Sequence, residues 1–278
     1  MEWPRTVLAG TGEIKVAQMP SFRIKQVDLD NKETAIQLQN SFEKDGFVML
    51  KSFIQDSPLA RQEIIDRLVK NGVSNQKLEI KGTNSPNLMQ DQDWINTCSH
   101  LKAFLEHEAL EKLAALLMYK TVAKPLPYKW LRAVGTGLFT GLHCDYVYVG
   151  HLAPVDSMIT FWIPIAKTIT TNEGSLIIAA GSHQDYQWKQ VRDIYGKTTV
   201  GRDGTASGWL TSDPSNLRDW LLPRSSPRLK NPNLPIWLSE DFEAGDVVAL
   251  NLGVMHITAT NTTRKWRLSC DERFIAMP

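Results

Sequence analysis

Leu142-His143-Cys144-Asp145-Tyr146-Val147-Tyr148-Val149 is the most informative stretch of this 278-residue chain. The run 146–149 consists of aromatic and β-branched residues, which favour a strand. Residues i and i+2 of a strand point to the same side, so we expect His143 and Asp145 to face one cavity. One imidazole and one carboxylate are two of the three ligands in a facial metal-binding triad. The tripeptide alone decides nothing, because a His-x-Asp pair at a strand start commonly makes a structural hydrogen bond.

A second histidine, His256, stands far downstream and can complete the triad. It follows a turn expected at 243–246 and a strand expected over 247–252. Arg267 lies on the next expected strand, where a buried guanidinium needs an anion, since an unpaired charge inside a barrel is costly. A planar guanidinium can hold a carboxylate by two hydrogen bonds, so with the triad present a dicarboxylic co-substrate is the better account. The alternative is a salt bridge within the chain, to Asp246, Asp271 or Glu272.

The first 120 residues carry helical signals. Apolar residues recur at helical spacing from Ala35 to Phe42, with Gly46 as a stop, and further helices are expected to begin near Ser57 and Ser99. After residue 120, short apolar runs alternate with Gly, Asn and Pro, as antiparallel strands do. The expected strands cover 128–134, 146–149, 158–165, 175–180, 246–252 and 266–274.

Helices followed by strands predict an α+β fold, namely a double-stranded β-helix (jelly-roll) barrel buttressed by N-terminal helices. We interpret 1–278 as a single domain, with about 1–125 as mainly helical support and about 126–278 as the jelly-roll core. The segment 184–238 is long for a connection between strands. It is expected to form a lid over the barrel mouth, with a packed insertion as the alternative. Its tryptophans, which would line that lid, are Trp188, Trp209, Trp220 and Trp237.

Composition excludes several classes of partner. Lys plus Arg is 31 and Asp plus Glu is 30, so the net charge of +1 argues against nucleic-acid or anionic-membrane binding. The three cysteines form no Cys-x-x-Cys pair, and no apolar stretch is long enough for a signal peptide or a membrane span. We therefore expect a cytoplasmic protein that acts on a small-molecule substrate, and we leave assembly into a homo-oligomer open.

Several motifs, in this order, make the chain resemble the phytanoyl-CoA dioxygenase-like branch of the Fe(II)/2-oxoglutarate oxygenases, and together they cover most of it. They are FEKDGFVMLKSF at 42–53, TGLHCD at 140–145, FWIP at 161–164, NEG at 172–174, GSH at 181–183, FEAGD at 242–246, His256, and RLSCD at 267–271. The resemblance implies that His143, Asp145 and His256 bind Fe(II), and that 2-oxoglutarate and O2 are co-substrates. It also implies that Arg267, eleven positions after His256, grips the distal carboxylate of 2-oxoglutarate.

Other positions match the family's co-substrate pocket. Trp162 and Thr258 correspond to residues that line it, and Thr140 stands where some relatives place a glutamine facing the co-substrate. His183, in the GSH turn, corresponds to no ligand.

The resemblance implies oxidation of a small organic molecule, as a step in biosynthesis, with release of succinate and CO2. Hydroxylation is favoured, because related halogenases have a small residue where this chain has Asp145. Desaturation, epoxidation or ring rearrangement of a natural product would use the same cofactors. A catalytically silent jelly-roll binding protein is the alternative of another class. A zinc hydrolase would leave Arg267 without a role.

Overall fold

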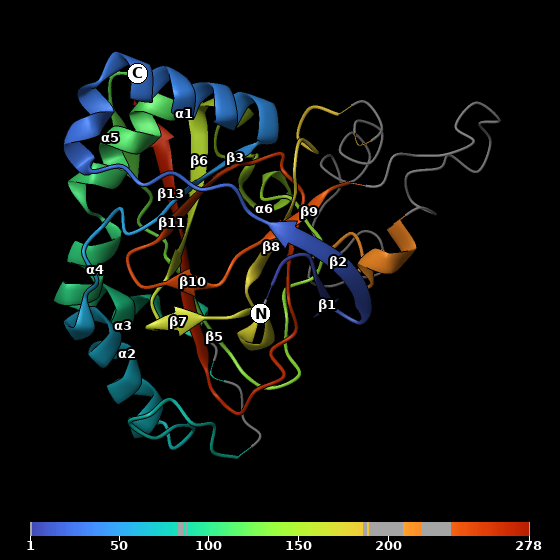
Figure 1. Cartoon of the computed structure of the whole chain (residues 1–278). Coiled ribbons are helices and arrows are strands. Elements are labelled where there is room, and N and C mark those ends of the chain that lie inside the picture. Colours follow the sequence, from blue (N-terminus) through green and yellow to red (C-terminus); the bar gives the residue numbers. More distant parts are fainter. Residues whose placement is uncertain are drawn as a thin grey trace.

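The computed structural model describes residues 2–82, 86, 88–185, 188, 208–217 and 235–277. Two sheets run side by side, and helices cover the outer side of the larger one (Figure 1). Helices on one side of largely antiparallel sheets agree with the α+β architecture expected from the sequence. Among the described helices, none combines the length and apolarity that crossing a bilayer requires.

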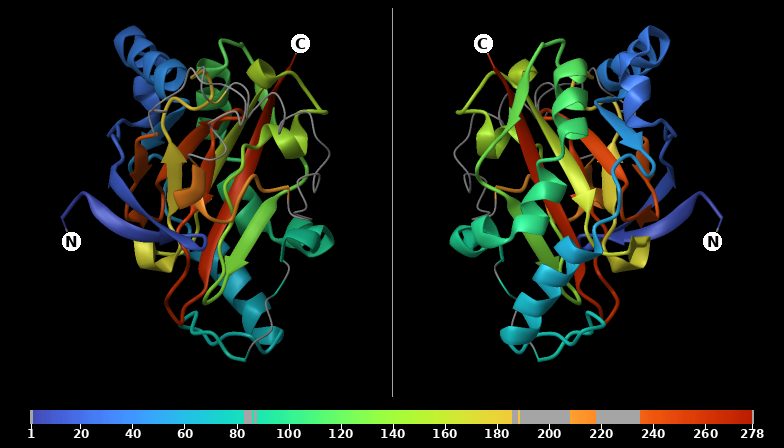
Figure 2. Two further views of the ribbon diagram at one scale, coloured as in Figure 1. Left: turned by 90° about the vertical axis from the view of Figure 1, so that its right-hand side faces the viewer. Right: turned by 90° about the vertical axis from the view of Figure 1, so that its left-hand side faces the viewer.

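The larger sheet is organised around one long strand, β13 (Arg267–Ala276), which runs along its whole length (Figure 2). The other strands of this sheet are β3 (Phe47–Leu50), β4 (Ala123–Pro125), β5 (Trp130–Val134), β6 (Met158–Pro164) and β11 (Val247–Asn251). The order is β3-β11-β6-β13-β4, and β5 pairs with β13 beside β4. All these pairings are antiparallel.

The smaller sheet contains a hairpin that we did not predict. Its order is β1-β2-β9-β8-β12, and a separate pair joins β7 to β10. The bounds are β1 (Arg5–Ala9), β2 (Gly12–Gln18), β7 (Thr168–Ile169), β8 (Leu176–Ala179), β9 (Trp237–Ser239), β10 (Phe242–Glu243) and β12 (His256–Thr258). Burial alternates along β1 and β2, with Val7, Ile14 and Val16 inside. Residues 5–18 therefore extend a sheet, whereas the rest of the described N-terminal region is mostly helical.

The helices follow the expected caps. They are α1 (Lys32–Asp45), α2 (Pro58–Lys70), α3 (Gln92–Thr97), α4 (Ser99–Leu105) and α5 (Glu108–Leu117), with short 3-10 turns η1 (Gln26–Asp30) and η2 (Leu88–Gln90). Gly46 ends α1 with φ of 80°, a conformation that favours glycine. The Ser57 side chain caps α2 by accepting from Ala60 N–H. The helix expected from Ser99 onward is divided, because His107 accepts from Ala109 N–H and starts a new helix.

One predicted strand is wrong. Residues 146–149 form a helical turn, α6 (Tyr146–Val149), rather than the continuation of a strand. Asp145 already has helical dihedral angles, φ of −68° and ψ of −23°, and its carbonyl accepts from the N–H groups of Tyr148 and Val149. Strand propensity was overridden by this local hydrogen bonding. Three further 3-10 turns are η3 (Val155–Ser157), η4 (Thr171–Glu173) and η5 (Pro214–Asn216).

Most of the segment 184–238 lies outside the described residues, and the expected lid with it. Its described part 208–217 is fastened to the chain before His143, because Leu210 N–H donates to the Leu142 carbonyl at 2.7 Å. Trp188 and Trp237 are buried in an apolar cluster with the smaller sheet, so these two tryptophans pack in the core. Trp209 is described and half-buried, while Trp220 lies outside the described residues.

Candidate metal centre

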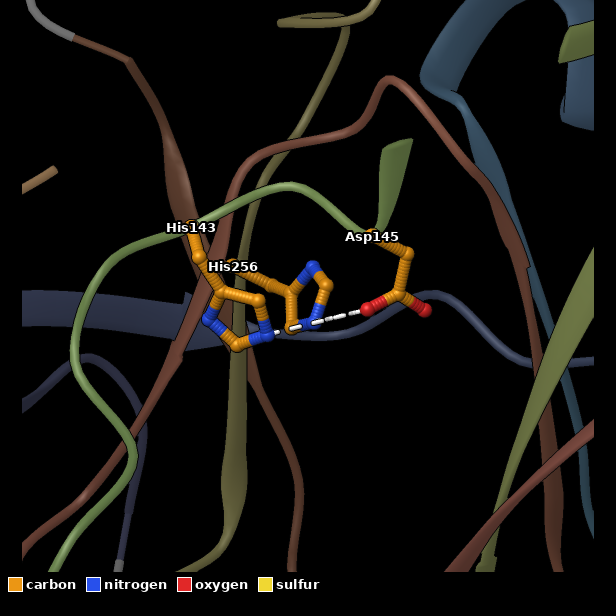
Figure 3. Close-up of side chains that lie close together, drawn as sticks. All are labelled: His143, Asp145 and His256. Carbon is orange, nitrogen blue, oxygen red and sulfur yellow. Dashed lines mark ion pairs between the residues drawn. The ribbon is translucent and has the colours of Figure 1, made fainter. Parts of the chain in front are cut away.

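Backbone pairing brings the two histidines together. His143 and His256 form an isolated antiparallel bridge, with N–H···O distances of 2.9 Å and 2.8 Å in the two directions. Their rings lie 4.2 Å apart between centroids. His256 begins β12, while Asp145 stands at the start of α6. The side chains of all three converge although no single strand carries His143 and Asp145, contrary to the geometry that we expected (Figure 3).

Both imidazole rings are oriented by backbone carbonyls. His143 Nδ1 lies 2.7 Å from the Gly141 carbonyl, and His256 Nδ1 lies 3.1 Å from the Val254 carbonyl. Donation from Nδ1 leaves the Nε2 lone pair of each ring available for a metal. Both Nε2 atoms point toward Asp145 Oδ1, at 3.7 Å and 3.8 Å (Figure 3). One ligand atom from each residue lies within 4.8 Å of the others.

The protonation states suit a cation. Burial, followed by the neighbouring His256, lowers the pKa of His143 to about 3, so that ring is neutral near pH 7. Burial alone would raise the pKa of Asp145, but Arg273, His256 and His143 outweigh it and hold that pKa well below its usual range. Asp145 Oδ2 has no hydrogen-bond partner among the described residues. A neutral imidazole and an ionised carboxylate are the forms that bind metal, and this donor set fits Fe(II) in a facial triad.

Arg273 is a residue of this centre that the sequence analysis missed. Its Nη2 lies 3.2 Å from Asp145 Oδ1, and its side chain is wholly buried. The guanidinium also stacks 3.8 Å from the Trp130 ring. The available signal was the alternation along β13, since Arg267 and Arg273 are six positions apart and so share a face.

Arg267 has no carboxylate partner among the described residues. Its Nη1 donates to Ser269 Oγ at 2.6 Å, while Nε and Nη2 make no described hydrogen bond. Burial, with the positive charge of Arg132, lowers the pKa of Arg267 to about 9. The three acidic residues considered as its partners pair elsewhere: Asp246 with Lys51, Asp271 with Arg132, and Glu272 with Lys129. A buried guanidinium with unpaired donors fits a carboxylate ligand such as that of 2-oxoglutarate.

The remaining predicted residues, Trp162, Thr258 and Thr140, are all buried. Trp162 is buried on β6 directly opposite Asp271 of β13, and its ring is 4.7 Å from that of Phe242. Thr258 follows His256 by two positions on β12, and its hydroxyl accepts from Thr140 N–H at 2.8 Å. This contact joins the strand of one histidine to the segment that leads into the other.

His183 lies apart from the triad. Its Nε2 contacts the Glu43 carbonyl at 2.8 Å, as expected for a residue of the turn rather than a ligand.

Comparison of the sequence with protein families assigns most of the chain. Residues 42–269 match the family model described as phytanoyl-CoA dioxygenase. The chain belongs to the phytanoyl-CoA dioxygenase family. It is accordingly an enzyme of the 2-oxoglutarate-dependent, non-haem iron class, and Fe(II) and 2-oxoglutarate are its cofactor and co-substrate. No curated protein sequence matches the chain.

Three solved structures of similar fold are the following enzymes. The non-haem alpha-ketoglutarate-dependent carbocyclase SnoK from nogalamycin biosynthesis is 14% identical, with a TM-score of 0.58 over 92% of this chain and 87% of that chain. The epimerase SnoN, in complex with Fe3+, alpha-ketoglutarate and nogalamycin RO, is 13% identical, with a TM-score of 0.53 over 88% and 85%. EctD from S. alaskensis, with 2-oxoglutarate and 5-hydroxyectoine, is 14% identical, with a TM-score of 0.51 over 86% and 75%. The likeness confirms the expected jelly-roll fold.

Proposed function

We propose that this dioxygenase hydroxylates a small organic molecule at a centre built from His143, Asp145 and His256. Arg267 is the proposed partner of the distal carboxylate of 2-oxoglutarate. The observation that carries the proposal is the convergence of three buried ligand atoms within 4.8 Å, on a barrel that also buries an arginine with unpaired donors. Trp162, Thr258 and Thr140 are proposed to line the co-substrate pocket.

The chain's own residues position the reactants. Carbonyls of Gly141 and Val254 fix the two imidazole rings, and Arg273 holds the Asp145 carboxylate. Ser269 supports the guanidinium of Arg267 from the same face of β13. Burial of these groups excludes water and strengthens each electrostatic contact. When bound, iron and 2-oxoglutarate supply the oxidising power, as is general for enzymes in which a cofactor carries the difficult chemistry.

The proposed reaction balances without a further reductant. 2-Oxoglutarate, O2 and a substrate C–H bond give succinate, CO2 and an alcohol, with one oxygen atom entering succinate and the other entering the alcohol. Hydroxylation is proposed over halogenation because Asp145 retains the carboxylate that halogenases replace with a small residue.

Product analysis by mass spectrometry, with 18O2, separates hydroxylation from desaturation or ring rearrangement.

Asp145→Ala tests the proposed centre. We expect iron-dependent formation of succinate from 2-oxoglutarate to fall to background, because the variant lacks the only carboxylate of the triad. Anaerobic calorimetric titration with Fe(II) measures binding independently of turnover, and circular dichroism checks that the variant is folded.

The matched control is Asp156→Ala, which removes an exposed carboxylate in η3. It should keep the activity of the unmodified enzyme. Normal succinate formation by a folded Asp145→Ala variant would remove Asp145 from the mechanism.

A further inference from the structure

A small pocket that reaches Thr140, three positions before His143, combines aromatic walls with one guanidinium. Its volume is about 210 Å³, and its lining includes Met89, Leu138, Phe139, Thr140, Trp209 and Arg132. Drug-sized ligands usually occupy pockets of roughly 300–1,000 Å³. This pocket therefore suits a compact molecule with an apolar body.

Trp209 forms part of the pocket wall and packs against the segment that precedes His143. Its ring packs so closely on Gly141 that a Cβ there would lie 2.5 Å from ring atoms. It also lies against Phe139, with ring centroids 5.4 Å apart. Because the Gly141 carbonyl orients His143, the aromatic wall and one proposed metal ligand depend on the same residue.

Arg132 is the charged group of the pocket, and one edge of it remains available. Its Nε donates to Asp271 Oδ2 at 2.9 Å, and its side chain is 24% exposed. Its two Nη groups make no hydrogen bond or ion pair with the described residues. Asp271 fixes the plane of the guanidinium, so the Nη edge is a preorganised donor pair for an anion.

The balance of charge around the centre also favours an anionic ligand. On the inner faces of β5 and β13 and at the triad, three guanidiniums face two carboxylates. They are Arg132, Arg267 and Arg273, against Asp145 and Asp271. A divalent iron and a dianionic 2-oxoglutarate cancel each other, so among the described residues of the centre one positive charge remains without a counter-charge. Buried or half-buried charges are stable when they are paired.

We propose that this pocket receives the substrate, and that the substrate is a small apolar or aromatic carboxylic acid whose carboxylate pairs with Arg132. The inference deepens the proposed function, on which it rests. Arg132 thereby becomes the specificity-determining residue, and it discriminates against neutral analogues because its Nη donors would be left without an acceptor. A coenzyme A thioester lacks the free carboxylate and is not the expected ligand.

The test compares two probes of the same skeleton and nearly the same size, the anionic 3-phenylpropanoate and the neutral 3-phenylpropanamide. Both are titrated anaerobically into enzyme loaded with Fe(II) and saturated with 2-oxoglutarate, so that Arg267 is already occupied, and binding is measured by calorimetry. A charge-assisted hydrogen bond contributes about 1.5–3 kcal/mol, so the acid should bind about 10- to 150-fold more tightly than the amide. Equal affinity for the two probes, or binding of neither, would overturn the proposal.

Two variants assign the preference to Arg132. Arg132→Gln should abolish the advantage of the acid, whereas Arg264→Gln, which removes an exposed arginine outside this pocket, should retain it. Arg132→Gln leaves the Asp271 carboxylate without its ion-pair partner, which can destabilise the fold. The double variant Arg132→Gln/Asp271→Asn removes both charges of the pair and so avoids this unpaired carboxylate. A folded double variant that still prefers the acid contradicts the proposal.

The titration is repeated on metal-free enzyme, and iron-dependent succinate formation is measured in parallel. Retention of the acid preference without any such succinate formation would remove the proposed function and leave the pocket assignment standing. Normal succinate formation without an acid preference would do the reverse.

Discussion

The two faces of β13 both bury charged residues, but they treat them differently. On the outer face, Leu268 and Phe274 pack into the core shared with the helices, and Glu272 between them receives a hydrogen bond of 2.6 Å from Lys129. On the inner face, Arg267 and Arg273 keep guanidinium nitrogens that bond to none of the described residues. One strand thus carries, on one face, a lysine with several partners and, on the other, two arginines with spare donors, of which Arg273 also pairs with Asp145.

The difference between the two faces indicates a structural role for the outer charged residues and a ligand-binding role for the inner ones. The Lys129 ammonium group finds all its partners within the chain. It contacts Glu272, Glu106 at 2.9 Å and the Leu126 carbonyl at 2.8 Å. Desolvating a charge without such partners costs several kcal/mol, and a fold retains that cost only where something else compensates it. The inner arginines therefore point to ligands that complete them, and the outer cluster to a structural role.

The strongest test of the outer face is Lys129→Met. We expect the free energy of unfolding to fall by about 3–5 kcal/mol, because the buried Glu272 side chain and the Leu126 carbonyl both lose the donor that satisfies them. Urea denaturation followed by circular dichroism measures this. The control Lys120→Met, at an exposed lysine, should stay within about 0.5 kcal/mol of the unmodified protein. Equal stability of both variants would contradict the structural role of the outer cluster.

The matching test of the inner face is Arg267→Ala. We expect 2-oxoglutarate binding to weaken by about 2–5 kcal/mol, because a buried carboxylate loses its charge-assisted partner. Anaerobic titrations measure 2-oxoglutarate and Fe(II) separately, and iron affinity should change little. If iron binding is lost and 2-oxoglutarate binding is unchanged, Arg267 belongs to the metal centre instead.

A finer test uses the pH dependence of stability. Burial raises the pKa of Glu272 from 4.5 to about 8, against the opposing effect of Lys129. The folded chain therefore keeps a proton that the unfolded chain releases, so this contribution is complete below pH 4.5 and is lost as pH rises toward 8. Glu272→Gln should flatten that decline by several kcal/mol, since the shift spans more than three pKa units and each unit corresponds to about 1.4 kcal/mol. An unchanged slope in urea denaturation across this window would show that Glu272 titrates normally.

The sequence predicted those features whose signals are local and repeated. Helix α1 combines buried Leu38 and Phe42 at helical spacing with a glycine that can adopt positive φ. The triad was recognisable from residue types and their order along the chain, although the predicted strand that justified the pairing of His143 and Asp145 does not form. Propensity favoured a strand at 146–149, but the carbonyl of Asp145 organises a helical turn there.

Features that depend on distant partners could not be predicted in this way. Arg273 gains its significance from contacts with Asp145 and Trp130, and nothing in the local sequence places those three side chains together. The hairpin β1–β2 shows alternating burial, but its five- and seven-residue strands are short enough to escape notice beside the helices. What makes it a sheet element is its pairing with β9.

That pairing has a consequence for the biogenesis of the protein. β2 aligns Ala17 with Leu238, and β13 supplies the centre of the larger sheet only once residues 267–276 have been synthesised. The larger sheet therefore cannot close before residue 276 has been synthesised, and the smaller sheet and the bridge between His143 and His256 cannot form before β12 has been synthesised. Contacts so remote in sequence slow folding and expose apolar strands meanwhile. Iron loading should therefore follow the synthesis of residue 256, because only then can the two histidines pair.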